Sequence, residues 1–258
     1  MAFAKEDCIA VFDSGLGGLS VLRHLMRIMP NERYVYYGDC ANAPYGTRST
    51  DQVRELTMAA AMHLLQNHPV KALVVACNTA TAAAIGHLRQ LYPDLVVIGI
   101  EPALKLAADR HPGGTIGVMA TQVTLREEKF QKLWERFAGG CTVHPIHAPG
   151  LVELVEAGQE DSDAADALLR NVLQDYVGKL DALVLGCTHY PFAAPAIGRI
   201  LGSHTELLDG GDGTARETHR RLRGADLLAK PCQEGCVILE CSGDSEKFQQ
   251  LATKLLYG

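Results

Sequence analysis

The sequence has no long apolar segment and no recognisable leader. No stretch approaches the roughly 18 consecutive apolar residues that indicate a transmembrane helix. Residues 1–7, MAFAKED, lack the basic and apolar regions of a signal peptide. We therefore expect a cytoplasmic protein without a membrane partner.

Clusters of basic residues are also missing. The chain carries 24 Lys and Arg residues against 30 Asp and Glu residues, for a formal net charge of -6. No Lys/Arg-rich run is present that could neutralise a row of phosphates or an anionic lipid surface. Neither nucleic acid nor a membrane surface is therefore an expected partner.

Metal and redox motifs are absent as well. The eight cysteines are scattered and include no CxxC, the usual signature of thiol redox catalysis. The nearest approach to a zinc site has no known zinc-site spacing and consists of Cys232, Cys236, Cys241, His144 and His147. We interpret these cysteines as small residues packed beside a strand. Free thiols are expected in a reducing cytosol, with no disulfide framework and no metal.

Nucleotide-binding motifs are incomplete. The glycine run DSGLGG, residues 13–18, lacks the GK[ST] ending of a phosphate loop and does not match GxGxxG. Its backbone amides would still suit a small carboxylate. Further groups that could hold such an anion without an arginine are Ser14, Tyr45, Gly46, Asn78, Thr79, Thr121 and Thr188.

The sequence does contain enough apolar residues for a sizeable core, since 47% of its 258 residues are hydrophobic. Short apolar runs alternate with amphipathic patterns, which is typical of an α/β fold with a parallel sheet and crossover helices. Strands are expected at residues 8–12, 34–37, 72–76, 96–100, 115–119, 182–185, 206–208 and 237–241. Helices are expected at residues 18–29, 50–67, 79–92, 125–137, 162–176, 194–201, 213–222 and 245–256. Ser49 and Gln52 have the spacing of a capping box at the start of the second helix.

An internal echo suggests a diverged duplication. The segment IAVFDSG at 9–15 resembles IGVMATQ at 116–122, and ALVVACNT at 72–79 resembles ALVLGCTH at 182–189. The two offsets, 107 and 110 residues, are nearly equal. We expect two facing, pseudo-symmetric α/β domains with mainly parallel sheets, each carrying one cysteine at the carboxyl end of a strand, where ligands bind in such sheets.

Those two cysteines, Cys77 and Cys187, leave several interpretations open. Either one alone could be a small buried residue. Cys187 with His189 could form a nucleophile and base, as in a thiol hydrolase, but this requires a third orienting group and leaves Cys77 unexplained.

A matched pair of thiols suits acid/base chemistry at a stereocentre, where one removes a proton and the other delivers a proton to the opposite face. A free thiol has a pKa of about 8.5, so half-ionisation at pH 7 needs a shift of about 1.5 units. A helix N-terminus after each strand could supply part of it. Candidate helpers are Asp13 for Cys77, and His189 with Glu153 for Cys187. Asp13 could instead cap the helix that follows the glycine run.

Four blocks of sequence resemble the signature blocks of the cofactor-independent glutamate racemases, in the usual order and spacing over essentially the whole chain. They are VFDSGLGGLSVL at 11–22, YGDCANAPYG at 37–46, VVACNTATA at 74–82 and VLGCTHYPF at 184–192. The wider group includes aspartate and hydantoin racemases, but the first and last blocks look most like the glutamate branch. One departure is Glu127 and Phe130, where many relatives have Ser and Tyr.

The resemblance implies interconversion of L- and D-glutamate without pyridoxal phosphate or metal, which would supply D-glutamate for bacterial peptidoglycan. It implies that Cys77 takes the proton from D-glutamate and Cys187 from L-glutamate. Asp13, Glu153 and His189 would tune the thiols, with Asp13 and His189 also contacting substrate. The remaining implied substrate-binding residues are Ser14, Tyr45, Gly46, Asn78, Thr79, Thr121 and Thr188.

The family fold implies that the C-terminal segment returns to the first domain. We therefore expect a first domain of residues 1–98 plus 209–258 and a second domain of residues 99–208. Members of the family often form homodimers, so a homodimer is expected here. The alternatives are a racemase for another amino acid, with aspartate as the first candidate, and a catalytically silent carboxylate-binding protein of the same fold.

Overall fold

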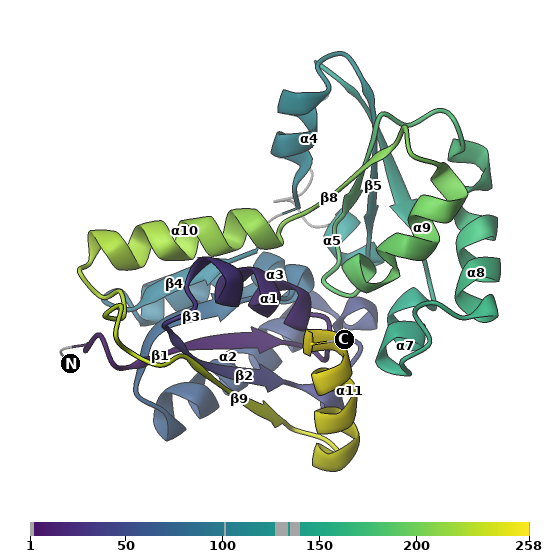
Figure 1. Ribbon diagram of the computed structural model, residues 1–258. Coiled ribbons are helices and arrows are strands. Elements are labelled where there is room, and N and C mark those ends of the chain that lie inside the picture. Colours follow the sequence, from purple (N-terminus) through teal and green to yellow (C-terminus); the bar gives the residue numbers. More distant parts are fainter. Residues whose placement is uncertain (1–2, 101, 127–133, 135–139, 258) are drawn as a thin grey trace. The chain divides into compact units, whose positions relative to one another are not determined.

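The structure, a computed structural model, describes residues 3–100, 102–126, 134 and 140–257. The chain forms two compact units. Unit 1 comprises Met1–Ile100 and Gly211–Gly258, and unit 2 comprises Glu101–Gly210. The C-terminal segment thus belongs to the same unit as the N-terminal segment (Figure 1).

Unit 1 is built on a parallel sheet with the strand order β4-β3-β1-β2-β9. Its strands are β1 (Cys8–Asp13), β2 (Arg33–Gly38), β3 (Val70–Val75), β4 (Val96–Gly99) and β9 (Cys236–Cys241). Its helices are α1 (Leu19–Ile28), α2 (Thr50–Asn67), α3 (Asn78–Leu91), α10 (Gly211–Gly224) and α11 (Ser245–Tyr257), with short 3-10 turns η1 (Cys40–Asn42) and η2 (Tyr45–Thr47). Because the strands are parallel, their carboxyl ends lie along one edge of the sheet.

Helices cover both faces of this sheet. Phe12 of β1 packs into a core shared with α2 and α3. On the opposite face, the Tyr34 hydroxyl donates to the carbonyl of Leu25 in α1 at 3.0 Å, and Tyr36 stacks on Phe248 of α11. Alternate strand residues therefore enter different cores, as the two-residue period of a strand requires.

The second helix starts where its capping residues indicate. The Ser49 hydroxyl accepts from the Gln52 amide at 3.3 Å, and the Gln52 side chain accepts from the Ser49 amide at 3.1 Å. Both donors would otherwise lack a partner within the helix. The expected helix at 50–67 is confirmed by α2.

Unit 2 has a parallel sheet with the strand order β6-β5-β7-β8. Its strands are β5 (Thr115–Ala120), β6 (Thr142–His147), β7 (Ala182–Leu185) and β8 (Glu206–Asp209). Its helices are α4 (Leu104–Arg110), α5 (Gln122–Arg126), α7 (Leu151–Glu156), α8 (Asp163–Leu173) and α9 (Ala194–Leu201), with 3-10 turns η3 (Gln174–Tyr176) and η4 (Tyr190–Ala193). Along β7, Ala182 and Val184 join a core with α4, whereas Leu183 and Leu185 join a core with α8 and α9.

The two sheets share one strand order. The order β4-β3-β1-β2 in unit 1 corresponds to β8-β7-β5-β6 in unit 2, and β9 is an addition at the edge of the first sheet. This correspondence pairs β1 with β5 and β3 with β7, the same strands that the internal sequence echo relates. The expected α/β class with parallel sheets is confirmed.

Among the described α-helices and strands, α4, α7 and β6 were not expected from the sequence. The first two are short, and β6 (TVHPIH) lies at an edge of its sheet and contains a proline, which strand patterns normally exclude. Most of the helix expected at 125–137, with Glu127 and Phe130, lies outside the described residues.

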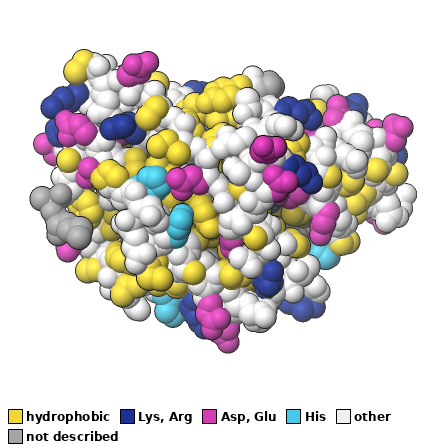
Figure 2. Space-filling view, turned by 90° about the horizontal axis from the view of Figure 1, so that it is seen from below, with side chains coloured by type: hydrophobic (Ala, Val, Ile, Leu, Met, Phe, Trp, Pro, Cys, Tyr) yellow, Lys and Arg dark blue, Asp and Glu magenta, His cyan; other side chains and the backbone are white. Residues whose placement is uncertain are grey.

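None of the helices among the described residues combines the length and apolar character needed to cross a membrane. On the face drawn in Figure 2, basic and acidic side chains are interspersed and do not gather into a patch of one sign.

Candidate active site

In unit 1, the candidate residues lie at the carboxyl ends of two adjacent strands. Asp13 is the last residue of β1, and Cys77 follows β3. The strands pair in parallel up to Phe12 and Val75, and the Ala76 amide donates to the Phe12 carbonyl at 2.8 Å. We call the set Asp13, Ser14, Cys77, Asn78 and Thr79 the Cys77 half-site.

Cys77 is the N-cap residue of α3, and 5% of its surface is exposed. Its sulfur accepts a hydrogen bond from the Ala80 amide at 3.5 Å, and its thiol donates to the Ser14 hydroxyl oxygen at 3.7 Å. A backbone amide and the positive end of a helix dipole both stabilise negative charge on a sulfur atom. The thiol therefore lies where it can give up a proton.

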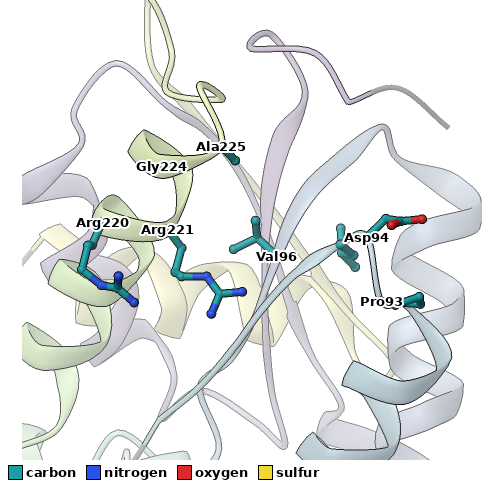
Figure 3. Close-up of a pocket in the computed structure, with 8 residues that line it drawn as sticks. Pro93, Asp94, Val96, Arg220, Arg221, Gly224 and Ala225 are labelled. Carbon is teal, nitrogen blue, oxygen red and sulfur yellow. The ribbon is translucent and has the colours of Figure 1, made fainter.

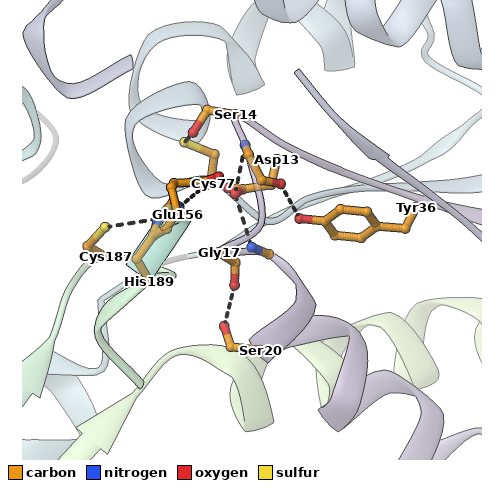
Figure 4. Close-up of polar contacts among 11 residues, drawn as sticks. Asp13, Ser14, Gly17, Ser20, Tyr36, Cys77, Glu156, Cys187 and His189 are labelled. Carbon is orange, nitrogen blue, oxygen red and sulfur yellow. Dashed lines mark hydrogen bonds and ion pairs between the residues drawn. The ribbon is translucent and has the colours of Figure 1, made fainter. Parts of the chain in front are cut away.

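Asp13 organises the glycine turn beside this thiol. Its Oδ2 atom accepts from the Gly15 amide at 3.2 Å and from the Gly18 amide at 3.0 Å (Figure 4). The Tyr36 hydroxyl donates to the Gly15 carbonyl at 2.6 Å. Gly18 lies so close that a Cβ atom there would be 2.6 Å from the Asp13 Cβ. The N-cap residue of α1 is Gly18, and no side chain caps it. Asp13 is therefore not the N-cap residue that the sequence left open, and it holds the glycine turn before the helix instead.

Two neighbouring residues differ in what they offer a ligand. Tyr45 is buried, and its hydroxyl donates to Oδ2 of Asp39 at 2.6 Å. Burial and the Asp39 carboxylate raise the pKa of Tyr45 above its ordinary value, so the hydroxyl stays protonated. Any contact of the Tyr45–Gly46 turn with a ligand would therefore come from its backbone.

In contrast, the buried side-chain oxygen of Asn78 has no hydrogen-bond partner among the described residues, and a ligand ammonium group would satisfy it.

In unit 2, Cys187 and His189 follow β7. The His189 Nδ1 atom lies 3.7 Å from the Cys187 sulfur, and Nε2 lies 2.6 Å from Oε1 of Glu156 (Figure 4). Burial favours neutral His189, but the hydrogen bonds with Cys187 and Glu156 outweigh it and raise the pKa of His189 well above 6.5. Cys187, Thr188, His189, Glu156 and Thr121 form the Cys187 half-site.

The acidic partner of His189 is Glu156, not Glu153. Both residues lie on α7, but Glu153 is exposed while the side chain of Glu156 is largely buried. Residues three apart on a helix point about 60° apart, which is enough to exchange an inward for an outward position. Glu156 shares its face with Val152, four residues earlier, so the helical period could have identified it.

The remaining candidates of unit 2 also lie at strand ends. Thr188 is buried directly after Cys187. Thr121 follows β5, and its Oγ1 atom accepts from the Thr124 amide at 3.3 Å. The Gly186 amide donates to the Met119 carbonyl at 2.8 Å, which ties the ends of β7 and β5 together.

The two cysteines have different local surroundings. Cys77 caps the 14-residue helix α3 directly, whereas Cys187 precedes the 3-10 turn η4, whose N-cap residue is His189. The expectation of a helix start at each cysteine thus holds for Cys77 only. In the Cys187 half-site, an imidazole takes the place that a helix amide has beside Cys77.

Among the described residues, no group of three or more His, Cys, Asp or Glu side chains is arranged to hold a metal ion. The set considered from the sequence is split, because His144 and His147 lie on β6 of unit 2 while its three cysteines lie in unit 1. A hollow of about 320 Å³ in unit 1 contains none of the expected site residues (Figure 3). Its lining comes from the segment before β4 and the end of α10, where Arg220 is already paired with Glu217.

Comparison with known proteins identifies the family. A sequence model of the Asp/Glu/Hydantoin racemase family matches residues 16–218. The chain is 45% identical over 257 residues to a glutamate racemase of Bifidobacterium adolescentis, covering 98% of this chain and 99% of that protein. It is 43% identical over 253 residues to a glutamate racemase of Clostridium perfringens, covering 98% and 97%.

Among solved structures, the crystal structure of glutamate racemase isoform RacE1 from Bacillus anthracis matches with a TM-score of 0.88 and 33% identity. The match covers 98% of this chain and 94% of that chain. The chain belongs to the Asp/Glu/Hydantoin racemase family, as the four sequence blocks indicated. It is therefore an enzyme of the isomerase class.

Proposed function

We propose that the protein interconverts L- and D-glutamate by proton transfer at the α-carbon, with Cys77 and Cys187 as the two acid/base groups. The observation that carries this proposal is the placement of a buried thiol after β3 in unit 1 and after its counterpart β7 in unit 2. Relatives at 43% and 45% identity over nearly the whole chain are glutamate racemases, which supports glutamate as the substrate.

The reaction needs one thiolate and one thiol at the start of each turnover. The thiolate takes the α-proton from one face of the substrate, leaving a carbanion and a new thiol. The other thiol then gives its proton to the opposite face and becomes a thiolate, so charge and protons balance. Cys77 acts as the base on D-glutamate and Cys187 as the base on L-glutamate. The proposal requires both sulfurs to reach the α-carbon of one substrate molecule.

The two thiolates are stabilised by different neighbouring groups. The Ala80 amide and the α3 N-terminus support a Cys77 thiolate. On the other side, Glu156 stabilises a protonated His189, and that imidazolium supports a Cys187 thiolate through Nδ1. Glu153 acts at most at longer range, since it is exposed on α7.

Polar groups without a guanidinium hold the substrate in this proposal. The Asn78 oxygen, which has no partner in the described part of the chain, accepts from the α-ammonium group. Carboxylates are held by hydroxyls and backbone amides of the two half-sites and of the Tyr45–Gly46 turn. The hydroxyl and amide donors are Ser14, Tyr45, Gly46, Thr79, Thr121 and Thr188. Asp13 and His189 also contact the substrate in this proposal, Asp13 from the Cys77 half-site and His189 from the Cys187 half-site.

We also propose that the protein works without pyridoxal phosphate or metal, as a cytoplasmic homodimer. In this role it provides D-glutamate for bacterial peptidoglycan. The family resemblance supports these points. They do not affect the test of the chemistry, which needs only the purified chain and substrate.

Solvent exchange tests the proposed reaction directly. In heavy water, each enantiomer of glutamate should lose its α-proton signal in proton NMR as deuterium enters from solvent. Cys77→Ala and Cys187→Ala should each abolish racemisation measured by circular dichroism. Cys232→Ala, which removes an exposed free thiol, is the matched control and should keep full activity. Full racemisation by either site variant would rule out the two-thiol mechanism. If the protein exchanged the α-proton of aspartate and not that of glutamate, aspartate would replace glutamate as the proposed substrate.

A further inference from the structure

A buried carboxylate links the Tyr45–Gly46 turn to the C-terminal part of the chain. Asp39, 4% exposed, follows β2 and accepts hydrogen bonds on both oxygens. The Tyr45 hydroxyl donates to Oδ2 at 2.6 Å, the Ser242 hydroxyl donates to Oδ1 at 2.6 Å, and the Asn42 side-chain amide lies within 3.2 Å of both. Burying a carboxylate is costly unless such donors surround it.

Ser242 reaches Asp39 because of the sheet register. β9 pairs with β2 so that Cys241 lies opposite Gly38, and the next residue on each strand is Ser242 and Asp39. The Ser242 amide also donates to the Gly38 carbonyl at 3.1 Å. The two residues are 203 positions apart in sequence, so only the added edge strand β9 brings this hydroxyl to the carboxylate.

The same serine also holds the start of the segment that leads to Tyr45. Its Oγ atom accepts from the Ala41 amide at 3.0 Å while donating to Asp39. The segment from Cys40 to Thr47 is thus fastened at Ala41 by Ser242, and at Asn42 and Tyr45 by Asp39. Removing the Ser242 hydroxyl would take away one donor to the buried carboxylate and the acceptor of the Ala41 amide at once.

We propose that Ser242 is a positioning residue for glutamate binding, which acts through Asp39 and Tyr45 to hold the backbone of the Tyr45–Gly46 turn in place. This inference rests on the proposed function, in which that turn holds a carboxylate of the substrate. Since the turn binds either enantiomer and takes no part in proton transfer, Ser242 affects binding and leaves the chemical step alone.

Steady-state kinetics of Ser242→Ala provide the test. KM for glutamate should rise at least about fivefold in both directions, as expected for the loss of a hydrogen bond to a charged group, while kcat stays within a factor of about two. Ser242→Thr keeps the hydroxyl and should restore KM. Ser245→Ala is the matched control, because Ser245 is exposed at the start of α11 and makes no hydrogen bond to Asp39.

A double variant tests the route through Asp39. If Ser242 and Tyr45 act through one carboxylate, the rise in KM for Ser242→Ala with Tyr45→Phe should differ from the product of the two single effects. An unchanged KM in Ser242→Ala, or a loss confined to kcat or to thermal stability, would overturn the inference and leave the proposed function intact. Failure of the unaltered protein to exchange the α-proton would overturn the proposed function and this inference with it.

Discussion

The His189 ring nitrogen Nε2 lies 2.6 Å from Oε1 of Glu156, and this contact leaves Nδ1 directed at the Cys187 sulfur. Glu156 therefore sets both the orientation and the charge of the imidazole. A carboxylate, an imidazole and a thiol in this order form a connected path for charge.

Replacing Glu156 by Gln should weaken proton transfer on the Cys187 side. Glutamine has the same size but lacks the negative charge that stabilises the imidazolium, so kcat should fall about tenfold to a hundredfold. Removal of the α-proton from L-glutamate then limits the rate more strongly. The primary isotope effect on kcat should rise for α-deuterated L-glutamate and fall for α-deuterated D-glutamate. Glu153→Gln, the matched control on α7, should leave both isotope effects unchanged.

The protonation of His189 should also make stability depend on pH. Its pKa is raised in the folded protein by Cys187 and Glu156 against the effect of burial. The stability gained from the charged imidazole is therefore complete below the ordinary pKa of about 6.5 and is lost as pH rises through the folded value. Denaturant unfolding across this range should show the decline, and His189→Asn should remove it. An unchanged decline in the variant would assign it to another group.

A methyl group at Gly18 should disturb the Asp13 turn. Its Cβ would lie 2.6 Å from the Asp13 Cβ and 3.0 Å from the Tyr36 hydroxyl, so Asp13 must move. We expect Gly18→Ala to lower stability by about 1–3 kcal/mol and to reduce racemisation, measured by thermal unfolding and circular dichroism. Gly86→Ala is the control, because Gly86 lies within α3 and, apart from its chain neighbours and the backbone of its own helix, no described residue comes within 4 Å of its added methyl group. It should stabilise the protein by up to about 1 kcal/mol.

Breaking a buried ion pair at the amino-terminal end of the first sheet should lower the free energy of unfolding. Lys71 Nζ lies 2.6 Å from Oε2 of Glu32, and the side chains are 0% and 2% exposed. Glu32 also accepts from the Ala229 amide at 2.8 Å. Lys71→Met should lower the free energy of unfolding by about 3–5 kcal/mol, because it leaves an unpaired buried carboxylate. Adding Glu32→Gln, which keeps an oxygen for Ala229, should recover part of that loss. A double variant as unstable as the single one would contradict this account.

Much of the fold was predictable because its signals are local. The bounds of α2, β7 and α9 agree with the sequence expectation. A capping box marks the start of α2, β7 is a continuous buried apolar run, and α9 is an amphipathic segment with Gly202 as its C-cap residue. The order of strands was not predictable in this way, because parallel pairing joins segments far apart in the chain. The edge strand β6 was missed because its proline interrupts the usual strand pattern and because its pairing depends on a neighbouring strand.

In the candidate site too, local sequence signals were predictable and contacts between distant segments were not. Motifs located Cys77 and Cys187, each next to the strand that positions it. They did not reveal Glu156, which required the rotational position of side chains on a short helix. The contact of Ser242 with Asp39 could not be predicted at all, since it depends on the register between β2 and β9.

The helix-capped thiol of Cys77 and the imidazole-supported thiol of Cys187 are chemically unlike, yet the two enantiomers of an amino acid have equal free energy in water. A catalyst cannot alter an equilibrium, so under the proposed function kcat/KM must have the same value in both directions. Unequal support of the two thiols must therefore be offset over the rest of the cycle, in the binding of the two enantiomers and in the interconversion of the two protonation forms of the free protein. The asymmetry can appear in kcat and in KM taken separately, but it cancels in their ratio. A reaction between mirror images thus needs no mirror symmetry in the protein that catalyses it.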